Sequence, residues 1–222
     1  MEDDGSSGKR GSGRETASGR AGILRKLVAR GSALPVGAKF MAQKANVLKE
    51  KLVPARVSSA YSKGVYRTPV GMGAVTAFGS RCISPAHQLG IRNAVDFYVP
   101  EGTPVRAPAD GVISAVAEKS RSRGISTRYW LKGNGLCIRC ANGERVWMEH
   151  MRHGFATELG IRVGQAVKAC DRVGTSGNTG FTENPHVHME VLKPGGGYVA
   201  LKIRFDRRDI PFDLYRGTIG KL

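Results

Sequence analysis

The chain has 222 residues, 41% of them hydrophobic, and it carries 35 lysine and arginine residues against 18 aspartate and glutamate residues. This composition allows one globular domain with extensions, and the formal net charge of +17 predicts attraction to nucleic acid, an anionic membrane face or an acidic cell-wall polymer. Because no run of 18 or more apolar residues occurs, no segment is expected to span a membrane.

Residues 1–64 hold much of the excess charge, with 13 lysine and arginine residues against 5 acidic ones, and are called the basic extension below. About the first 22 residues are expected to be disordered, because they contain too little apolar surface to bury. Residues 37–53 have a helix-forming composition that Pro54 ends. The start lacks the apolar stretch of a secretory signal, and its acidic residues argue against an organellar transit peptide without excluding organellar import. The compartment therefore stays unknown.

From Val65 onward the sequence changes to short apolar, β-branched runs separated by glycine, proline and asparagine. The runs that suit strands or strand pairs are NAVDFYV, TPVRAPADGVISAVAE, GLCIRCANGERVWMEHM, QAVKACDRVGTSG, HVHMEVL and VALKIRF. Long periodic helices are absent, so we predict an all-β, mainly antiparallel domain over residues 65–205. Residues 118–130 are predicted to form a basic hairpin at the rim of a cleft. Residues 206–222 are predicted to be a polar tail whose Ile-Pro-Phe packs back on the sheet.

Cys137 and Cys140 form a CxxC pair, a pattern that can bind zinc or carry out redox chemistry. Here the pair lies in an expected hairpin that turns at Asn142-Gly143. Residues i and i+3 of a strand face opposite sides of the sheet, so the two sulfurs should diverge. A metal, redox or disulfide role is not favoured.

His186 and His188 are two of only five histidines, and on a strand both would project from one face. Two structural histidines or part of a metal site would both fit this spacing.

Asp96 follows apolar Val95 and needs a partner if it is buried, either zinc or an arginine such as Arg92. Catalytic zinc sites use three histidine or carboxylate ligands and leave a fourth position to water, a count that His87, Asp96 and one histidine of the pair would meet.

Several separate motifs follow one another along the chain: VDFYVPEGTPVRAPADGVI, then MEHM, then GTSGNTGFTENP and HVHMEV. Together they resemble the lysostaphin/LytM-type zinc endopeptidases, over about residues 65–205. The separation between His87 and Asp96 resembles a longer-spaced branch of that family. The resemblance implies an all-β, antiparallel β-sandwich or open barrel, the duplicated hybrid motif of these peptidases.

By the same resemblance, His87, Asp96 and His188 bind one zinc ion, and His150 and His186 are the unligated catalytic histidines. Such a site would hydrolyse peptide bonds in peptidoglycan, at a stem cross-link or a glycine bridge, with a water that zinc activates. Family members act in the cell envelope or are secreted. His153 fits no motif and is predicted to lie on the surface, and Asn178 and Thr179 are predicted to form a turn that shapes the cleft.

A second hypothesis is a non-catalytic subunit built on the same fold. In that case the basic extension would anchor the domain in a large assembly, such as an RNA-containing or organellar complex. Intact His150 and His186 favour the enzyme, whereas the basic extension favours the assembly subunit. Since fold does not fix function, the sequence leaves both hypotheses open.

Overall fold

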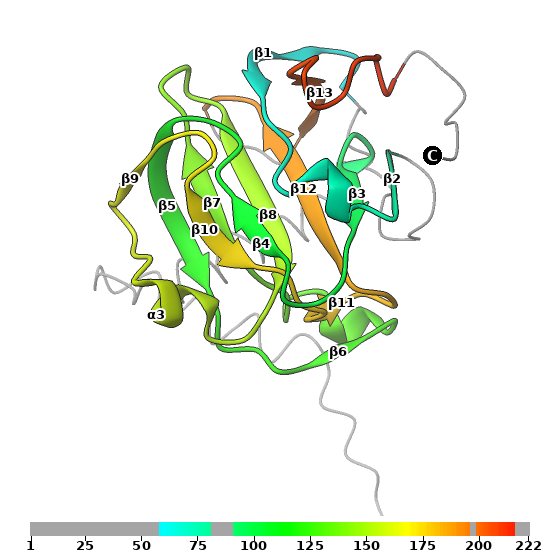
Figure 1. The fold of residues 1–222 in the computed structure, drawn as a ribbon, viewed down its shortest axis with the longest axis vertical. Helices are drawn as coiled ribbons and strands as arrows, with labels where there is room; N and C mark the ends of the chain where they lie inside the picture. The colour runs from blue at the N-terminus through cyan, green and yellow to red at the C-terminus, as the bar shows by residue number, and fades with distance from the viewer. Residues whose placement is uncertain (1–57, 81–90, 196–198, 216–222) are drawn as a thin grey trace, which may run out of the picture. The chain divides into compact units, whose positions relative to one another are not determined.

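The computed structural model describes residues 58–80, 91–195 and 199–215. The predicted helix at 37–53, most of the basic extension and His87 lie outside these residues. Among the described residues almost all regular structure is β-strand (Figure 1). The strands are β1 (Tyr61–Tyr66), β2 (Ala77–Ser80), β3 (Val95–Tyr98), β4 (Pro104–Arg106), β5 (Gly111–Ala117), β6 (Arg123–Gly124), β7 (Asn134–Arg139), β8 (Arg145–Met151), β9 (Ala166–Val167), β10 (Arg172–Thr175), β11 (Gly180–Phe181), β12 (His186–Leu192) and β13 (Ala200–Phe205).

Helical structure in the described residues is short: α3 (Phe155–Leu159) and single turns at Met72–Ala74 and Thr127–Tyr129. None of these helices is long and apolar enough to cross a membrane. The prediction of an all-β domain is therefore confirmed.

A nine-stranded sheet forms the main body, in the order β1-β13-β12-β8-β7-β5-β9, with β3 pairing β12 and β2 pairing β3 (Figure 1). Its pairs are antiparallel except β1 with β13, which is parallel. Strand β12 lies at the centre: β8 pairs along one side, while β3 and then β13 pair along the other. This position places β3 along the whole HVH motif and β8 beside His188 on the other side.

Strand β12 alternates as its sequence predicts. Val187, Met189 and Val191 belong to the main hydrophobic core. His186 and His188 lie opposite Tyr98 and Asp96 of β3, so both histidines occupy one face of the sheet. The two-residue period of the strand thus separates the packing side chains from the polar ones.

The β7–β8 hairpin confirms that the CxxC sulfurs diverge. Cys140 packs in the main core, whereas Cys137 packs with Trp147 in a second, smaller cluster on the other face. Burial raises the pKa of the Cys137 thiol to about 12 and also raises the pKa of Cys140. Both thiols therefore stay protonated and unreactive at neutral pH.

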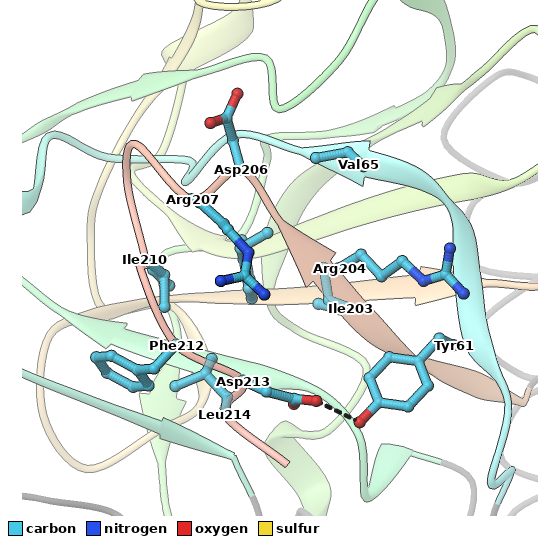
Figure 2. Close-up of a pocket in the computed structure, with 11 residues that line it drawn as sticks. Tyr61, Val65, Ile203, Arg204, Asp206, Arg207, Ile210, Phe212, Asp213 and Leu214 are labelled. Carbon is cyan, nitrogen blue, oxygen red and sulfur yellow. Dashed lines mark hydrogen bonds between the residues drawn. The ribbon is translucent and has the colours of Figure 1, made fainter. Parts of the chain in front are cut away.

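The sheet begins before the predicted boundary at residue 65, because β1 starts at Tyr61 and pairs with β13. The tail is anchored as predicted: Ile210 is 1% exposed and joins the core, although Phe212 of the same Ile-Pro-Phe is 53% exposed. Figure 2 shows the pocket that this tail forms with β1 and β13, where the Tyr61 hydroxyl donates to Asp213 at 2.7 Å.

Glu144, in the turn between β7 and β8, holds β1 against this hairpin. Its buried carboxylate accepts hydrogen bonds from the backbone N–H groups of Lys63 (2.7 Å) and Gly64 (3.0 Å) and from the Tyr66 hydroxyl (2.7 Å). Burial alone would raise the pKa of Glu144, but these hydrogen bonds outweigh it and lower the pKa. The ionised form is therefore the one that stabilises the fold.

Glu144→Gln is expected to lower the free energy of unfolding by about 2 kcal/mol at neutral pH, because an amide cannot accept all three bonds. The difference in unfolding free energy between wild type and variant is expected to shrink as pH falls below the ordinary pKa of glutamate. At low pH the wild-type side chain is protonated too, so it loses the carboxylate that accepts these bonds. Urea unfolding at several pH values measures this difference, with exposed Glu183→Gln as the matched control. Equal stabilities of the two variants would contradict the anchoring role.

Candidate active site

Strands β3, β8 and β12 bring a carboxylate and three histidines together. Asp96 lies opposite His188 in the β3–β12 ladder, and its Oδ1 is 2.8 Å from His188 Nδ1 and 3.6 Å from His186 Nε2. The rings of His150 and His186 have centroids 4.4 Å apart. All four side chains are buried. The alternative partner of Asp96, Arg92, is exposed, so histidines surround this carboxylate instead.

A β-bulge in β8 brings His150 to this face. Glu149 pairs with Gly135 and Met151 pairs with Asn134, so His150 is one extra residue between successive rungs of the ladder. It adopts φ 67°, a left-handed conformation that is uncommon outside glycine. In a regular strand His150 would face away from its neighbour Glu149, which lies opposite His188 on the site's face. The bulge therefore reorients the imidazole.

Gly135 allows the close strand approach beside the bulge. A Cβ at this position would lie 2.2 Å from the carbonyl oxygen of Met148, a distance that no side chain tolerates. The glycine is therefore part of what permits the bulged backbone that carries His150.

Backbone carbonyls fix the tautomers of two histidines. His150 Nδ1 is 2.7 Å from the Thr179 carbonyl oxygen, and His186 Nδ1 is 2.8 Å from that of Asn184. A carbonyl oxygen can only accept, so each Nδ1 carries the proton, and the Nε2 of each neutral ring keeps its lone pair. In its neutral form each ring therefore presents a proton-accepting or metal-ligating Nε2.

Burial and neighbouring charge set the protonation of the histidines in opposite directions. Burial, followed by the closeness of His186, lowers the pKa of His150 to about 3. Burial would also lower the pKa of His188, but the hydrogen bond and charge of Asp96 raise it overall. His150 is thus neutral at physiological pH, and His188 is paired with a carboxylate.

The donor atoms fit a metal ion. His150, His186 and His188 each offer a nitrogen, and these atoms lie within 4.8 Å of one another. Imidazole nitrogens with a carboxylate oxygen are a donor set that zinc accepts. This group shares only His188 with the predicted ligand set, and the predicted ligand His87 lies outside the described residues. Which histidines bind a metal and which transfer protons therefore stays a prediction.

Local sequence patterns do not predict the groups that hold the histidines. Thr179, expected only to shape a turn, fixes His150 through its carbonyl, and its hydroxyl donates to Met151 O at 2.8 Å and accepts from Asn134 N at 2.9 Å. The glycines that flank Thr179 indicated the turn but not its contact with His150. His153, predicted to lie on the surface, is partly exposed. The segment 118–130, predicted to be a hairpin, contains a two-residue strand, β6, that pairs in parallel with β11.

A β-sheet that gathers three buried histidines and a buried carboxylate is typical of a metal site in a hydrolase. The model of Peptidase family M23 matches residues 90–200, half of the chain, and the chain belongs to this metallopeptidase family. The resemblance to lysostaphin/LytM-type peptidases is thereby confirmed.

Three proteins illustrate the similarity. The DD-carboxypeptidase/endopeptidase Mpg of Neisseria meningitidis serogroup B is 34% identical over 113 residues, which cover 51% of this chain and 23% of that protein. The peptidoglycan DD-endopeptidase ShyA of Vibrio cholerae is 32% identical over 127 residues, covering 56% and 26%. The catalytic domain of lysostaphin from Staphylococcus simulans is 26% identical, with a TM-score of 0.41 and coverage of 56% of this chain and 83% of that one. The chain spans about a quarter of the length of the two curated relatives.

Proposed function

We propose that this chain is a zinc-dependent metalloendopeptidase that hydrolyses peptide bonds in the cross-links or stems of peptidoglycan. The buried convergence of Asp96 with His150, His186 and His188 carries the proposal. Membership of peptidase family M23 supports it, as do relatives named as peptidoglycan DD-endopeptidases. The positive charge of the chain would help it to stay on an anionic wall polymer.

In this proposal His87, Asp96 and His188 hold the zinc ion. Zinc supplies a Lewis acid that polarises the scissile carbonyl and lowers the pKa of water toward about 7. Asp96 and His188 already lie together at 2.8 Å, on paired strands whose backbone bonds fix their separation. This rigidity favours them as ligands, because a preformed donor pair needs little rearrangement to bind a metal.

His150 and His186 transfer the protons. Each presents an unprotonated Nε2 while a backbone carbonyl holds its Nδ1, so either ring can take a proton from the attacking water. The N–H group formed in that step can then donate to the developing oxyanion or to the leaving amine. Their burial excludes bulk water, which strengthens these interactions.

The test uses the full chain, metal content by elemental analysis, and mass spectrometry of the fragments that it releases from purified peptidoglycan. We expect about one zinc ion per chain, new amino termini within the peptide moieties, loss of hydrolysis with a chelator and recovery on adding zinc. Hydrolysis that persists in metal-free protein would overturn the proposal. So would a protein that binds zinc but releases no peptide fragments.

The second hypothesis is a non-catalytic subunit that the basic extension binds to RNA or to an organellar complex. The structure describes only residues 58–64 of that extension. Nothing in the described part of the chain favours this hypothesis over the enzyme. Four buried, convergent site residues favour the enzyme, since a purely structural domain would not require a carboxylate and three imidazoles held at one point.

A further inference from the structure

We propose that a basic pocket beside the candidate active site binds a free carboxylate of the substrate peptide. The enzyme would then favour acidic peptide stems over uncharged glycine bridges; this inference rests on the proposed function and narrows its substrate class. The pocket, called the arginine pocket, is lined by Glu101, Arg121, Arg123, Arg152, His153, Gly177, Asn178 and Thr179.

The arginine pocket shares two wall residues, Gly177 and Thr179, with the backbone that holds His150. Its wall residue Thr179 holds His150 through the 2.7 Å contact between its carbonyl oxygen and Nδ1, and the Gly177 N–H donates to the His150 carbonyl at 3.0 Å. Arg152, another wall residue, follows His150 by two positions in the chain. A substrate peptide that extends past His150 could therefore reach this pocket with a neighbouring carboxylate.

The arginine-bearing segment is fixed in place. Its strand β6 pairs with β11, the strand that follows Thr179, and the Gly180 N–H donates to the Ser122 carbonyl at 2.8 Å (Figure 1). The Asn134 side chain accepts from Ser120 N at 2.9 Å and donates to Ser120 O at 2.8 Å. The Asn134 backbone N–H also donates to the Thr179 hydroxyl. One buried asparagine thus links the arginine segment to the residue that fixes His150.

The three arginines differ in how far their charge is neutralised. Arg152 is bonded to Glu158, and Arg123 Nη1 is 3.7 Å from Glu101 Oε1. Arg121 forms no ion pair with any other described residue. The pocket therefore carries uncompensated positive charge, chiefly at Arg121.

A planar guanidinium matches a carboxylate, because it can donate two parallel hydrogen bonds to the two oxygens. Peptide stems supply such a group as a free terminal or side-chain carboxylate. A glycine bridge has no charged side chain, and an amidated stem has lost the charge at that position. A single pocket lined by three arginines fits one carboxylate better than it fits the extended phosphate backbone of a nucleic acid, which needs a row of cations.

The experiment compares two synthetic stem peptides that differ only at one position near the cleaved bond, a free carboxylate in one and a carboxamide in the other. We expect the full-length, zinc-loaded protein to prefer the carboxylate by about tenfold in kcat/KM. Arg121→Ala should bring the ratio close to 1, and Arg121→Lys should restore part of it. Arg139→Ala removes one exposed arginine at the far end of β7 and should keep the full ratio.

A wild-type ratio near 1, or an equal loss of preference in Arg139→Ala, would overturn the inference while leaving the proposed function standing. If neither peptide is cleaved, the proposed function fails, and binding of the two intact peptides to the full chain decides the inference separately. Tighter binding of the carboxylate that depends on Arg121 would uphold the arginine pocket. Equal binding of both peptides would overturn it.

Discussion

His150→Ala is expected to abolish detectable hydrolysis while the protein keeps its zinc. A positioned general acid or base contributes about 10²- to 10⁴-fold to a rate, and with His150 removed only His186 remains to serve both as proton acceptor and as proton donor. His150 lies on the face of His188 but makes its hydrogen bond to the Thr179 carbonyl rather than to Asp96. Hydrolysis rates and zinc content measured on the same preparation check this prediction.

Thermal unfolding of His150→Ala provides the control, because loss of activity counts only for a protein that still folds. Equal zinc loss in His150→Ala and in His188→Ala would refute the division of roles. The group of His150, His186 and His188, whose donor atoms lie within 4.8 Å of one another, would then be the better ligand set.

Removal of a proposed ligand is expected to have the second large effect. His188→Ala and Asp96→Ala should each lower zinc content from about one ion per chain to near zero, and hydrolysis should disappear with the metal. The 2.8 Å contact between the two side chains means that either change also removes a buried polar partner of the other. Elemental analysis after dialysis measures the zinc, and circular dichroism checks that the sheet persists.

His87→Ala should behave like these two variants, because His87 is the third predicted ligand. His153→Ala is the matched histidine control for zinc content, since its side chain is partly exposed and belongs to no predicted ligand set. Full zinc retention by His87→Ala would exclude the long-spaced ligand assignment. The metal would then depend on Asp96 together with His150, His186 and His188.

The two-residue period of a strand allows the direction of several side chains to be predicted from the sequence alone. Alternating side chains in HVHMEVL predict a strand with two histidines on one face, and the register of β12 against β3 confirms it. The i, i+3 spacing of Cys137 and Cys140 predicts that their sulfurs diverge, as the two separate clusters show. These are local properties, because the strand period alone sets which way a side chain points.

Local patterns could not predict features that depend on contacts between distant segments. Asp96 and His188 meet across 92 positions, and only strand pairing sets that register. The start of the sheet at Tyr61 and the anchoring of the tail by Ile210 likewise depend on β13 and the core.

The orientation of His150 shows most clearly what only the tertiary structure decided. In the sequence MEHM it occupies an ordinary strand position, and alternation would place it on the wrong face. The extra residue in β8, the room left by Gly135 and the carbonyl of Thr179 together turn it toward His186. The sequence by itself determined the fold class, most of the strands and the placement of His186 and His188 on one face. Packing between strands decided the geometry of the site, because a bulge is stable only where its neighbours supply the space and the hydrogen bonds.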